Sequence, residues 1–518
     1  MSSQTNTLHT RALGVDYVGH PLHPLIYFQT TFYLVIRERN CSLIIVSLFI
    51  VFMPTADRLT LLQNFGRSIE SAAYIYRPTH TEHVAEIFSL AADRQFKIGV
   101  RGSGRSYGDA SLNAGGIILD LRRMNRIIEW GPESGVINVE PGVTIQQIWQ
   151  YTLEDGWWLP VVPGTMFPTI GGCLAMNIHG KNNYVAGPIG EHVLEFEALL
   201  PTDELITCSP QRNADLFYAM IGGAGVLGVF TSITLQMKKI HSGNVWVDAW
   251  AAPTLRAMMN DFEPIKGESD YLVGWVDGTH SRGRGQIHRA TYLRGDEDHE
   301  PTQTLSVEYQ TLPDTFFGVV PKSILWRLMR PFMSDLGTTL INTAKYAHAR
   351  LLEHRKRNVQ SLVAFNFLLD YVPNWEKSYG SGGLIQYQSF IPREQAHDVF
   401  IEMLRLCQKR GMPTYLGVLK RHRPDQFLLT HAVDGYSLAM DFPAKEGNRI
   451  DLQKLADVMN EIVLSVGGRF YFAKDSTLNA DIVRRYLGDD TLERFRKLKA
   501  RCDPDGLLET ELYRRLFS

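Results

Sequence analysis

A short glycine-rich stretch, RGSGRSYGD, is the first part of the sequence whose residue types could do chemistry. It begins at Arg101 and places three glycines beside two arginines and two serines. Gly102 and Gly104 allow the backbone to come close to a ligand. Arg101, Arg105 and Ser106 supply two positive charges and a hydroxyl donor. The stretch is therefore either a phosphate cradle or a plain turn.

The elements on either side decide which phosphate ligand such a loop could hold. Residues 79–94 carry apolar side chains at helical spacing, and FKIGV at 96–100 indicates a strand. GIILDL at 116–121 follows the loop and indicates another strand. A Rossmann turn needs a helix directly after the glycines, because the helix N-terminus meets the pyrophosphate. The loop is therefore not a Rossmann turn.

A second glycine motif, GAGVLG at 223–228, matches the dinucleotide-binding pattern letter for letter. A helical stretch, NADLFYAMI, precedes it, and a strand, VFTSITLQM, follows it. This order is the reverse of the strand, turn and helix that dinucleotide binding requires. We therefore predict a helix-to-strand packing turn here and no NAD site.

A third segment, LPVVPGTMFPTIGGCLAMNIHGKN at 159–182, is also rich in glycine. Gly171 and Gly172 open a short helix of small residues, and the segment ends with His179 and Lys181. Two glycine-rich loops, one of which ends beside a histidine and a lysine, indicate a long ligand with many contacts.

Composition excludes several other classes of function. The 518 residues suggest two or three globular domains, and a net charge of -2 gives no electrostatic reason to expect nucleic acid. Five scattered cysteines without a C-x-x-C pair argue against a disulfide framework and a cysteine zinc site. His80 and His83 have a spacing that a metal could use, but no third ligand is near. We expect no metal.

The N-terminus carries an apolar run, LIIVSLFIVFM, from Leu43 to Met53. It is shorter than the roughly 20 residues that span a bilayer, and charged residues interrupt it upstream. About forty polar residues precede it, unlike a signal peptide. We expect residues 1–55 to be an extension, in which the part before Met53 is either a non-native start or a loose membrane anchor.

The two glycine loops and the GGAGVLGVFTSITL turn together resemble the FAD-binding PCMH-type domain of the vanillyl-alcohol-oxidase-type flavoproteins. SGGLIQYQSFIP at 381–392, AMDFP, GGRFYFAKDS and DPDGLLET are similar to the decaprenylphosphoryl-ribose 2′-oxidase branch of that family. The resemblance runs from about Leu59 to the C-terminus. It implies an α+β fold with a two-subdomain FAD-binding domain at 56–240, an α+β substrate-binding cap at 241–465 and a C-terminal segment at 466–518 that closes on the flavin.

The resemblance also implies the residues of the FAD site. Many relatives carry the flavin covalently on a histidine at the position of Arg105, so the arginine implies noncovalent FAD. The residues implied for the cofactor are Arg101, Gly102, Ser103, Gly104, Arg105, Ser106, Tyr107, Gly108, Gly164, Thr169, Ile170, Gly171, Gly172, Met176, Asn177, Ile178, His179 and Tyr471.

On the substrate side, Lys474 matches a family lysine that could act as a base, since desolvation lowers a lysine pKa; otherwise it is a solvated strand-end lysine. His179 either polarises the substrate or contacts the flavin, or is a satisfied buried histidine. Gln386 and Gln388 share one strand face, where they bind sugar hydroxyls or face solvent. Lys420 suits a substrate phosphate, or lies in a solvated loop. Further implied substrate contacts are Tyr107, Lys181 and Trp275.

The implied reaction is FAD-dependent oxidation of the 2′-hydroxyl of a polyprenyl-phosphoryl ribose, the first half of epimerisation to an arabinose donor for cell-envelope polysaccharide. It implies an NAD(P)H-dependent ketoreductase partner and association with either face of a bacterial inner membrane. Phe316–Met333 has a composition that suits an anionic membrane surface or a packed cap helix. The alternatives are an oxidase or dehydrogenase of free sugars, aldonolactones or alditols, and a non-catalytic FAD-binding partner.

Two positions depart from the actinobacterial members of the branch. Their cysteine in the strand before DFP is Ala439 here, and their tyrosine before the LLD segment is Asn366. We therefore expect thiol-directed inhibitors of those members to fail on this protein.

Overall fold

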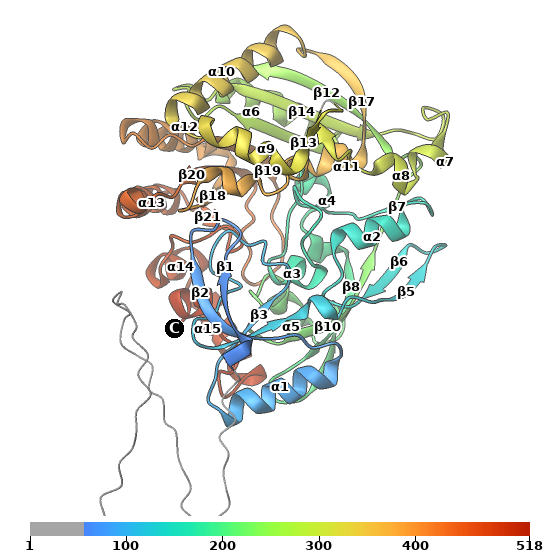
Figure 1. The fold of residues 1–518 in the computed structure, drawn as a ribbon, viewed down its shortest axis with the longest axis vertical. Helices are drawn as coiled ribbons and strands as arrows, with labels where there is room; N and C mark the ends of the chain where they lie inside the picture. Colours follow the sequence, from blue (N-terminus) through green and yellow to red (C-terminus); the bar gives the residue numbers. More distant parts are fainter. Residues whose placement is uncertain (1–55, 317) are drawn as a thin grey trace, which may run out of the picture. The chain divides into compact units, whose positions relative to one another are not determined.

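The computed structural model describes residues 56–316 and 318–518, and three sheets carry most of the residues that position the site. The predicted extension at 1–55 lies outside the described residues. Residues from 56 onward belong to one compact unit. The domain boundaries near 240 and 465 therefore stay a prediction. The first two sheets lie in the lower half of Figure 1, and the third lies in the upper half.

The first sheet holds the strand that leads into the glycine loop. Its strands, in spatial order, are β1 (Leu59–Gln63), β2 (Glu70–Tyr76), β4 (Ile117–Asp120) and β3 (Ile98–Arg101). β4 runs parallel to both of its neighbours. Helix α1 (Thr81–Asp93) connects β2 to β3 and buries its apolar side chains, as their helical spacing predicts. The predicted arrangement of strand, glycine loop and strand is confirmed, with β3 beginning two residues later than expected.

The second sheet is antiparallel and follows in sequence. Its strands, in spatial order, are β5 (Ile127–Gly131), β6 (Val136–Val139), β10 (Val229–Gln236), β8 (Val193–Leu199) and β9 (Leu205–Cys208). The helices of this region are α2 (Ile145–Thr152), α3 (Ile170–Ala175), α4 (Asn183–Ala186) and α5 (Ala214–Met220). The GAGVLG turn joins α5 to β10, which confirms the predicted helix-to-strand turn.

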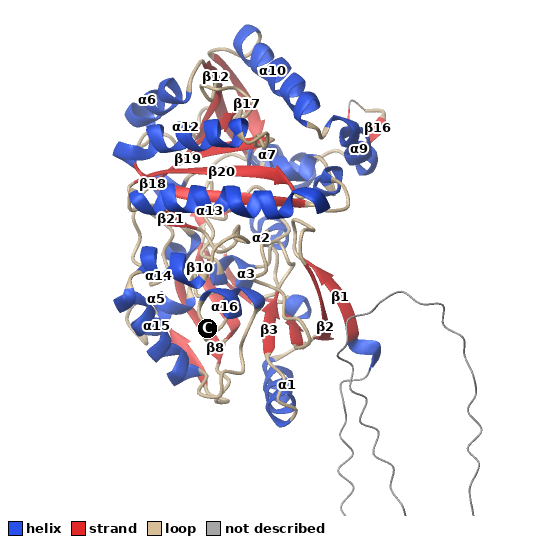
Figure 2. Cartoon of the chain, turned by 90° about the vertical axis from the view of Figure 1, so that its left-hand side faces the viewer, coloured by secondary structure: helices blue, strands red, loops and turns tan. Residues whose placement is uncertain are grey.

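The third sheet, called the cap sheet below, has antiparallel neighbours throughout. Its strands, in spatial order, are β17 (Lys356–Ser361), β12 (Asn244–Ala252), β14 (Gly285–Tyr292), β13 (Tyr271–Val276), β19 (Leu416–His422), β20 (Gly435–Pro443), β18 (Leu384–Pro392) and β21 (Arg469–Phe470). Helices α12 (Arg393–Lys409) and α13 (Arg449–Ser465) lie along β18 and β20 (Figure 2). Helix α10 (Asp335–Leu351) contacts β12 and β14.

Alternation along β13 gives the cap sheet two different faces. A side chain at Gly274 would meet Met258 of α6 (Leu255–Ile265), whereas Trp275 packs with Tyr346 and Ala349 of α10. The face that carries Trp275 is turned toward the glycine loops. Shorter elements are α7 (Pro301–Thr304), α8 (Val307–Gln310), α9 (Lys322–Met329), α11 (Leu362–Asn366), β7 (Trp157–Trp158), β11 (Lys238–Lys239), β15 (Thr315–Phe316) and β16 (Val320–Pro321).

The last part of the chain returns to the first sheet. After β21 come α14 (Ala480–Leu487), α15 (Asp489–Cys502) and α16 (Glu511–Leu516). The backbone N–H of Ile98 donates to the carbonyl of Leu507 at 2.8 Å, and the N–H of Glu509 donates to the carbonyl of Ile98 at 2.8 Å. The C-terminal residues thus extend the sheet edge at β3, beside the glycine loop.

The architecture is mixed α+β, as predicted, with two smaller sheets in the first half and a large antiparallel sheet in the second half. Over residues 56–316 and 318–518, none of the helices combines the length and the apolar character that a membrane crossing needs.

Candidate functional site

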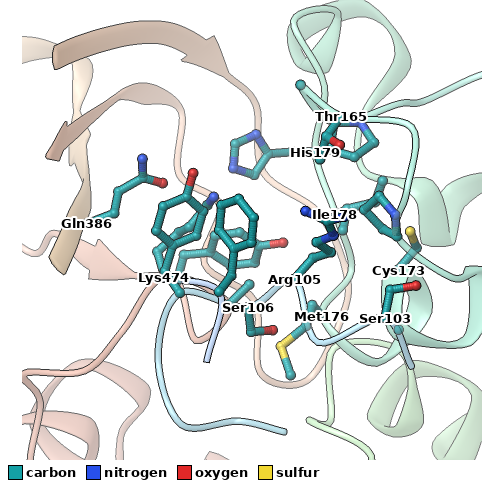
Figure 3. A pocket seen from close by; sticks show the side chains of 18 of the residues that line it. Ser103, Arg105, Ser106, Thr165, Cys173, Met176, Ile178, His179, Gln386 and Lys474 are labelled. Carbon is teal, nitrogen blue, oxygen red and sulfur yellow. The ribbon is translucent and has the colours of Figure 1, made fainter. Parts of the chain in front are cut away.

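A cavity of about 440 Å³ lies between the glycine loops and the cap sheet. Most of the residues that the sequence predicts for the site line it together. These are Gly102, Ser103, Gly104, Arg105, Ser106, Tyr107, Gly164, Thr169, Gly171, Gly172, Met176, Ile178, His179, Lys181, Trp275, Gln386, Gln388, Lys420, Tyr471 and Lys474. In Figure 3, Gln386 and Lys474 lie on one side of the pocket, Ser103 and Cys173 lie on the other, and Arg105 lies between them.

The end of the cavity lined by Gly102–Ser106, Thr169, Gly171 and Gly172 is called the nucleotide end. A Cβ added at Gly102 would stand 2.0 Å from the Thr169 hydroxyl, and one added at Gly171 would stand 2.7 Å from Pro141. Gly104 has a φ of +64°, which favours glycine. The glycine backbones therefore lie directly against the Thr169 and Pro141 side chains, in a lining that only small residues can form. Such a lining suits a phosphate-bearing ligand.

The two arginines of the loop have different surroundings. Arg101 donates to the carbonyl and hydroxyl of Ser111, at 3.1 and 2.9 Å, and to the carbonyl of Gln63 at 3.0 Å. It therefore fixes the loop from behind and is absent from the cavity lining. Arg105 lines the cavity with its guanidinium between the rings of Phe65 and Phe167, 5.2 and 5.1 Å from their centroids. Burial lowers the pKa of both arginines from its ordinary value.

The glycine loop is joined to the segment that carries Lys474. A Cβ added at Gly108 would stand 1.5 Å from the carbonyl oxygen of Asp475, and the Tyr107 N–H donates to the Ala473 carbonyl at 2.8 Å. Arg515 of α16 bridges the two segments through buried carboxylates, 2.7 Å from Asp109 and 2.8 Å from Asp475. This packing is what brings Lys474 to the cavity.

Lys474 lies in a turn after β21, with its amine 3.7 Å from the centroid of the Tyr107 ring. Burial lowers the pKa of Lys474, the positive charge of Lys420 lowers it further in the same direction, and Asp441 opposes both. Asp441 accepts a hydrogen bond from the Gln386 side chain at 2.5 Å, and burial raises its pKa. Lys474 therefore holds a neutral amine at a lower pH than an ordinary lysine does.

His179 lies beside two other predicted residues. Its Nε2 is 3.3 Å from the Gln388 amide, and its Nδ1 is 3.4 Å from the Lys420 amine. Burial and the nearby Lys420 hold the pKa of His179 well below its ordinary value, so the ring is neutral and can accept a hydrogen bond from the lysine. Burial lowers the pKa of Lys420 to about 8. Lys474, Gln386, Gln388, His179 and Lys420 are called the reactive cluster below.

The strand register explains why the reactive cluster forms. Gln388 of β18 pairs with Ala439 of β20, and Ala439 pairs with Val418 of β19. Gln388, Ala439 and Val418 therefore form a row across three strands. Gln386 is two residues from Gln388 on β18, and Lys420 is two residues from Val418 on β19, so their side chains lie on the same sheet face as this row. The prediction that Gln386 and Gln388 share one face agrees with this register, and both are buried rather than solvent-facing.

Some residues predicted for the site contact other parts of the protein instead of the cavity, or in addition to it. The Lys181 amine donates to the carbonyls of Phe365 and Asn366, at the end of α11, and burial lowers its pKa to about 7. Asn177 has a φ of 43°, and its side chain accepts a hydrogen bond from Gly190 N–H at 3.0 Å. Residues predicted for the cofactor that do not line the cavity are Arg101, Gly108, Ile170 and Asn177.

The cavity also has lining residues that sequence reasoning missed. Gly225 and Gly228 of the GAGVLG turn line it, so this turn contributes to the site although it is not a dinucleotide-binding turn. Thr165 also lines the cavity, and its hydroxyl donates to the Asp370 carboxylate at 2.6 Å. Burial raises the pKa of Asp370 to about 6. The glycine pattern could have indicated the first pair, but no local signal marks Asp370. Further lining residues include Phe65, Cys173, His288, Lys345 and Trp375.

These residues fit FAD. The small-residue lining and the Ser103, Ser106 and Thr169 hydroxyls suit a pyrophosphate, and the aromatic and amide side chains beyond them suit a flavin ring. In the part of the chain that the structure describes, no three His, Cys, Asp or Glu side chains gather in a way that could hold a metal ion.

Comparison with known proteins agrees with this fit. The family model described as "FAD binding domain" matches residues 72–209. The chain is 28% identical over 479 residues to decaprenylphosphoryl-beta-D-ribose oxidase of Mycolicibacterium smegmatis, which covers 90% of this chain and 98% of that one. It is 26% identical over 395 residues to an uncharacterized protein of Streptomyces coelicolor (72% and 100% covered), and 28% identical over 197 residues to cytokinin dehydrogenase 7 of Oryza sativa subsp. japonica (36% and 36%). The chain contains an FAD-binding domain and is an FAD-linked oxidoreductase.

Proposed function

We propose that this protein oxidises the 2′-hydroxyl of a polyprenyl-phosphoryl ribose to the 2′-keto sugar. The observation that supports it is the buried reactive cluster, in a chain similar over 90% of its length to a protein named as a decaprenylphosphoryl-ribose oxidase. The cluster combines an amine of lowered pKa with two amides on one strand face. These are the groups that a sugar oxidation needs, a proton acceptor and partners for the other hydroxyls.

In this proposal, bound FAD supplies the acceptor for the hydride that leaves the carbon of the reacting alcohol. The neutral Lys474 amine accepts the hydroxyl proton, so a carbon–hydrogen and an oxygen–hydrogen bond break as the carbonyl forms. Gln386 is held by Asp441 and presents the rest of its amide to the sugar. His179 stays neutral and orients the substrate oxygen or the flavin edge.

The FAD is proposed to be noncovalent. Arg105 occupies the position at which many similar flavoproteins carry the histidine that forms the flavin bond, and a guanidinium between two rings offers no such nucleophile. Acid precipitation of the purified protein tests this. We expect the flavin absorbance to pass into the supernatant, and flavin that stays with the pellet would contradict the proposal.

The anaerobic absorbance spectrum tests the substrate. We expect the flavin band to bleach when farnesylphosphoryl ribose is added to the purified holoenzyme. The band should remain when farnesylphosphoryl arabinose, the epimer, is added instead, and when free ribose is added. A band that stays oxidised with the ribose lipid would overturn the substrate assignment and leave the FAD-linked oxidoreductase in place.

The second candidate is an oxidase or dehydrogenase of free sugars, aldonolactones or alditols. Gln386 and Gln388 would serve any polyol, and Ala439 and Asn366 differ from the branch that acts on the ribose lipid, which favours this alternative. Bleaching by a free polyol, with hydrogen peroxide formed at the rate of flavin turnover in air, would support it over the lipid substrate.

Membrane contact and a partner reductase are also part of the proposal. The keto product needs an NAD(P)H-dependent ketoreductase to reach the arabinose epimer. Helices α9 and α10 expose large apolar side chains, with Arg327 and Arg330 exposed beside them, a combination that suits an anionic bilayer surface. Lys322, expected in the same stretch, is buried instead, with its amine 4.7 Å from the Tyr371 ring centroid. Sedimentation with anionic vesicles, and its loss in Leu336→Asp, tests the contact.

A further inference from the structure

Lysine amines line the cavity, but no Asp or Glu of the described residues does. Four lysines line it, namely Lys181, Lys345, Lys420 and Lys474. The lysines that form ion pairs with carboxylates in the described part of the chain are others, namely Lys266, Lys454, Lys497 and Lys499. Desolvated amines without a carboxylate partner are costly, and an anionic ligand would offset that cost.

Three of the four amines are accounted for by the site already described. Lys474 and Lys420 belong to the reactive cluster, and Lys181 donates to two backbone carbonyls. Lys345 has no such use. In residues 56–316 and 318–518 its amine makes no hydrogen bond and no ion pair with a side chain, although it reaches the cavity from α10.

Lys345 is placed by the packing of α10 on the cap sheet. Tyr346 and Ala349 of the helix pack with Ala251 and Trp275, which fixes the helix over the sheet. The residue as a whole is exposed on the helix, but its amine turns inward and lies 4.2 Å from the centroid of the Trp275 ring, which is buried. Burial lowers the pKa of Lys345 to about 8, against the opposing charge of Glu353.

Glu353 does not neutralise Lys345. Its carboxylate accepts a hydrogen bond from the Gln286 side chain at 2.6 Å and lies 3.6 Å from His348 on its other oxygen. It therefore has other partners, and it does not line the cavity.

His288 lies at the same end of the cavity. It is on β14, opposite Val273 of β13, which is two residues from Trp275 on the same face of the strand. Burial lowers the pKa of His288 to about 4, and the charges of Lys345 and Lys181 act in the same direction. Trp275, His288 and Lys345 all line the cavity, with the Lys345 amine over the face of the Trp275 ring, and the part of the cavity that they define is called the cap end. The cap end is separated from Gln388 by the Val418 and Ala439 positions of the row.

We propose that Lys345 and His288 form an anion subsite at the cap end, which takes the phosphate group of a lipid phosphate. Lys345 supplies the charge, His288 supplies a hydrogen bond, and Trp275 forms an apolar wall for the first carbons of the lipid. That the natural ligand is the phosphodiester of the substrate rests on the proposed function. The subsite would place the sugar between the anion and the reactive cluster.

Calorimetric titration of the FAD-loaded protein with farnesyl monophosphate tests the subsite without any oxidation. We expect Lys345→Met to weaken binding about tenfold or more, because a charge-assisted contact in a desolvated place is lost. Lys345→Arg keeps the charge and should bind within a few fold of the wild type. Arg350→Met is the matched control, since it removes one positive charge from an exposed position of the same helix, and should change nothing.

Two further probes identify the source of the phosphate. Farnesol, which lacks the anion, should bind weakly and equally to the wild type and Lys345→Met. Inorganic phosphate that binds as tightly as farnesyl monophosphate, and in a Lys345-dependent way, would support the anion subsite but assign it to free anions. Equal binding of farnesyl monophosphate by the wild type and Lys345→Met, with the FAD content of both unchanged, would overturn the subsite.

The outcome is independent of the proposed function. Lys345-dependent binding of farnesyl monophosphate together with a flavin that no ribose lipid bleaches would keep the subsite and reject the substrate. Bleaching by the ribose lipid with no effect of Lys345→Met on binding would keep the substrate and reject the subsite.

Discussion

The nucleotide end and the cap end of the cavity differ in how their charged side chains are held and in how much room they leave. At the nucleotide end, Arg101 has three hydrogen bonds to the protein behind the lining, Arg105 lies between two aromatic rings, and a Cβ added at Gly102 or Gly171 would meet a neighbouring side chain. At the cap end, the Lys345 amine lies over the Trp275 ring without a hydrogen bond or ion pair in residues 56–316 and 318–518, and Trp275 is held by a helix that is exposed on its outer side. The first arrangement is complete before a ligand binds, whereas the second is completed by the ligand.

The difference suits a cofactor on one side and a substrate on the other. A resident cofactor benefits from a rigid cradle, because little order is lost when it binds. A substrate that must enter and leave is better served by groups whose charge it neutralises only while it is bound.

The largest effect is expected from Gly108→Ala, which breaks the rigid end. The added Cβ would meet the backbone carbonyl of Asp475, which no side-chain rotation relieves. We expect loss of most bound FAD and a fall in the free energy of unfolding of about 2 kcal/mol or more. The flavin-to-protein absorbance ratio and urea unfolding measure both. Gly447→Ala, where nothing lies within 4 Å, is the control; normal FAD content in Gly108→Ala would show that the cradle is not rigid.

Lys474→Met should separate binding of the cofactor from chemistry. The amine lies over the Tyr107 ring and is not needed to hold the glycine loops, so we expect FAD content to be unchanged. The rate of anaerobic flavin reduction by the ribose lipid should fall by roughly 10²–10⁴-fold, as for loss of a general base. Stopped-flow absorbance measures this rate, with the exposed Lys409→Met as the control. An unchanged rate would remove Lys474 from the mechanism.

The sequence reaches the two ends to different extents. The nucleotide end could be predicted because its glycines form two local pairs, Gly102 with Gly104 and Gly171 with Gly172, and glycine allows backbone conformations and close approaches that other residues do not. His288 and Lys345 could not, because each lies in an ordinary amphipathic strand or helix and acquires its role only from the register of β13 with β14 and the packing of α10. The sequence predicts Arg101 for the cofactor because it shows the positive charge of this residue but not its hydrogen bonds to Ser111.

The pH dependence of flavin reduction should follow the charges around Lys474. The rate should rise as pH rises through the pKa of Lys474, since only the neutral amine accepts a proton, and the midpoint should lie below the ordinary lysine value. Lys420→Met removes a nearby positive charge and should move the midpoint up. Asp441→Asn removes a negative charge and should move it down. Shifts of the same sign in both variants would contradict the electrostatic explanation.

The smallest effect on turnover is expected at Ala439, which lies between the cap end and Gln388 in the strand register. Ala439 pairs with Val418 and Gln388 and lines the cavity, at the position where the family resemblance implies a cysteine in actinobacterial members. Of the described cysteines, Cys173 lines the cavity, but burial raises the pKa of its thiol, so little reactive thiolate forms. We therefore expect no adduct in the intact mass of the wild type after turnover with a thiol-directed inhibitor. Ala439→Cys should gain one adduct and keep its rate within about threefold, because one sulfur adds little volume beside a cavity. An adduct on Cys173 in the wild type would show that the cavity lining around Cys173 is more open and more polar than its packing indicates.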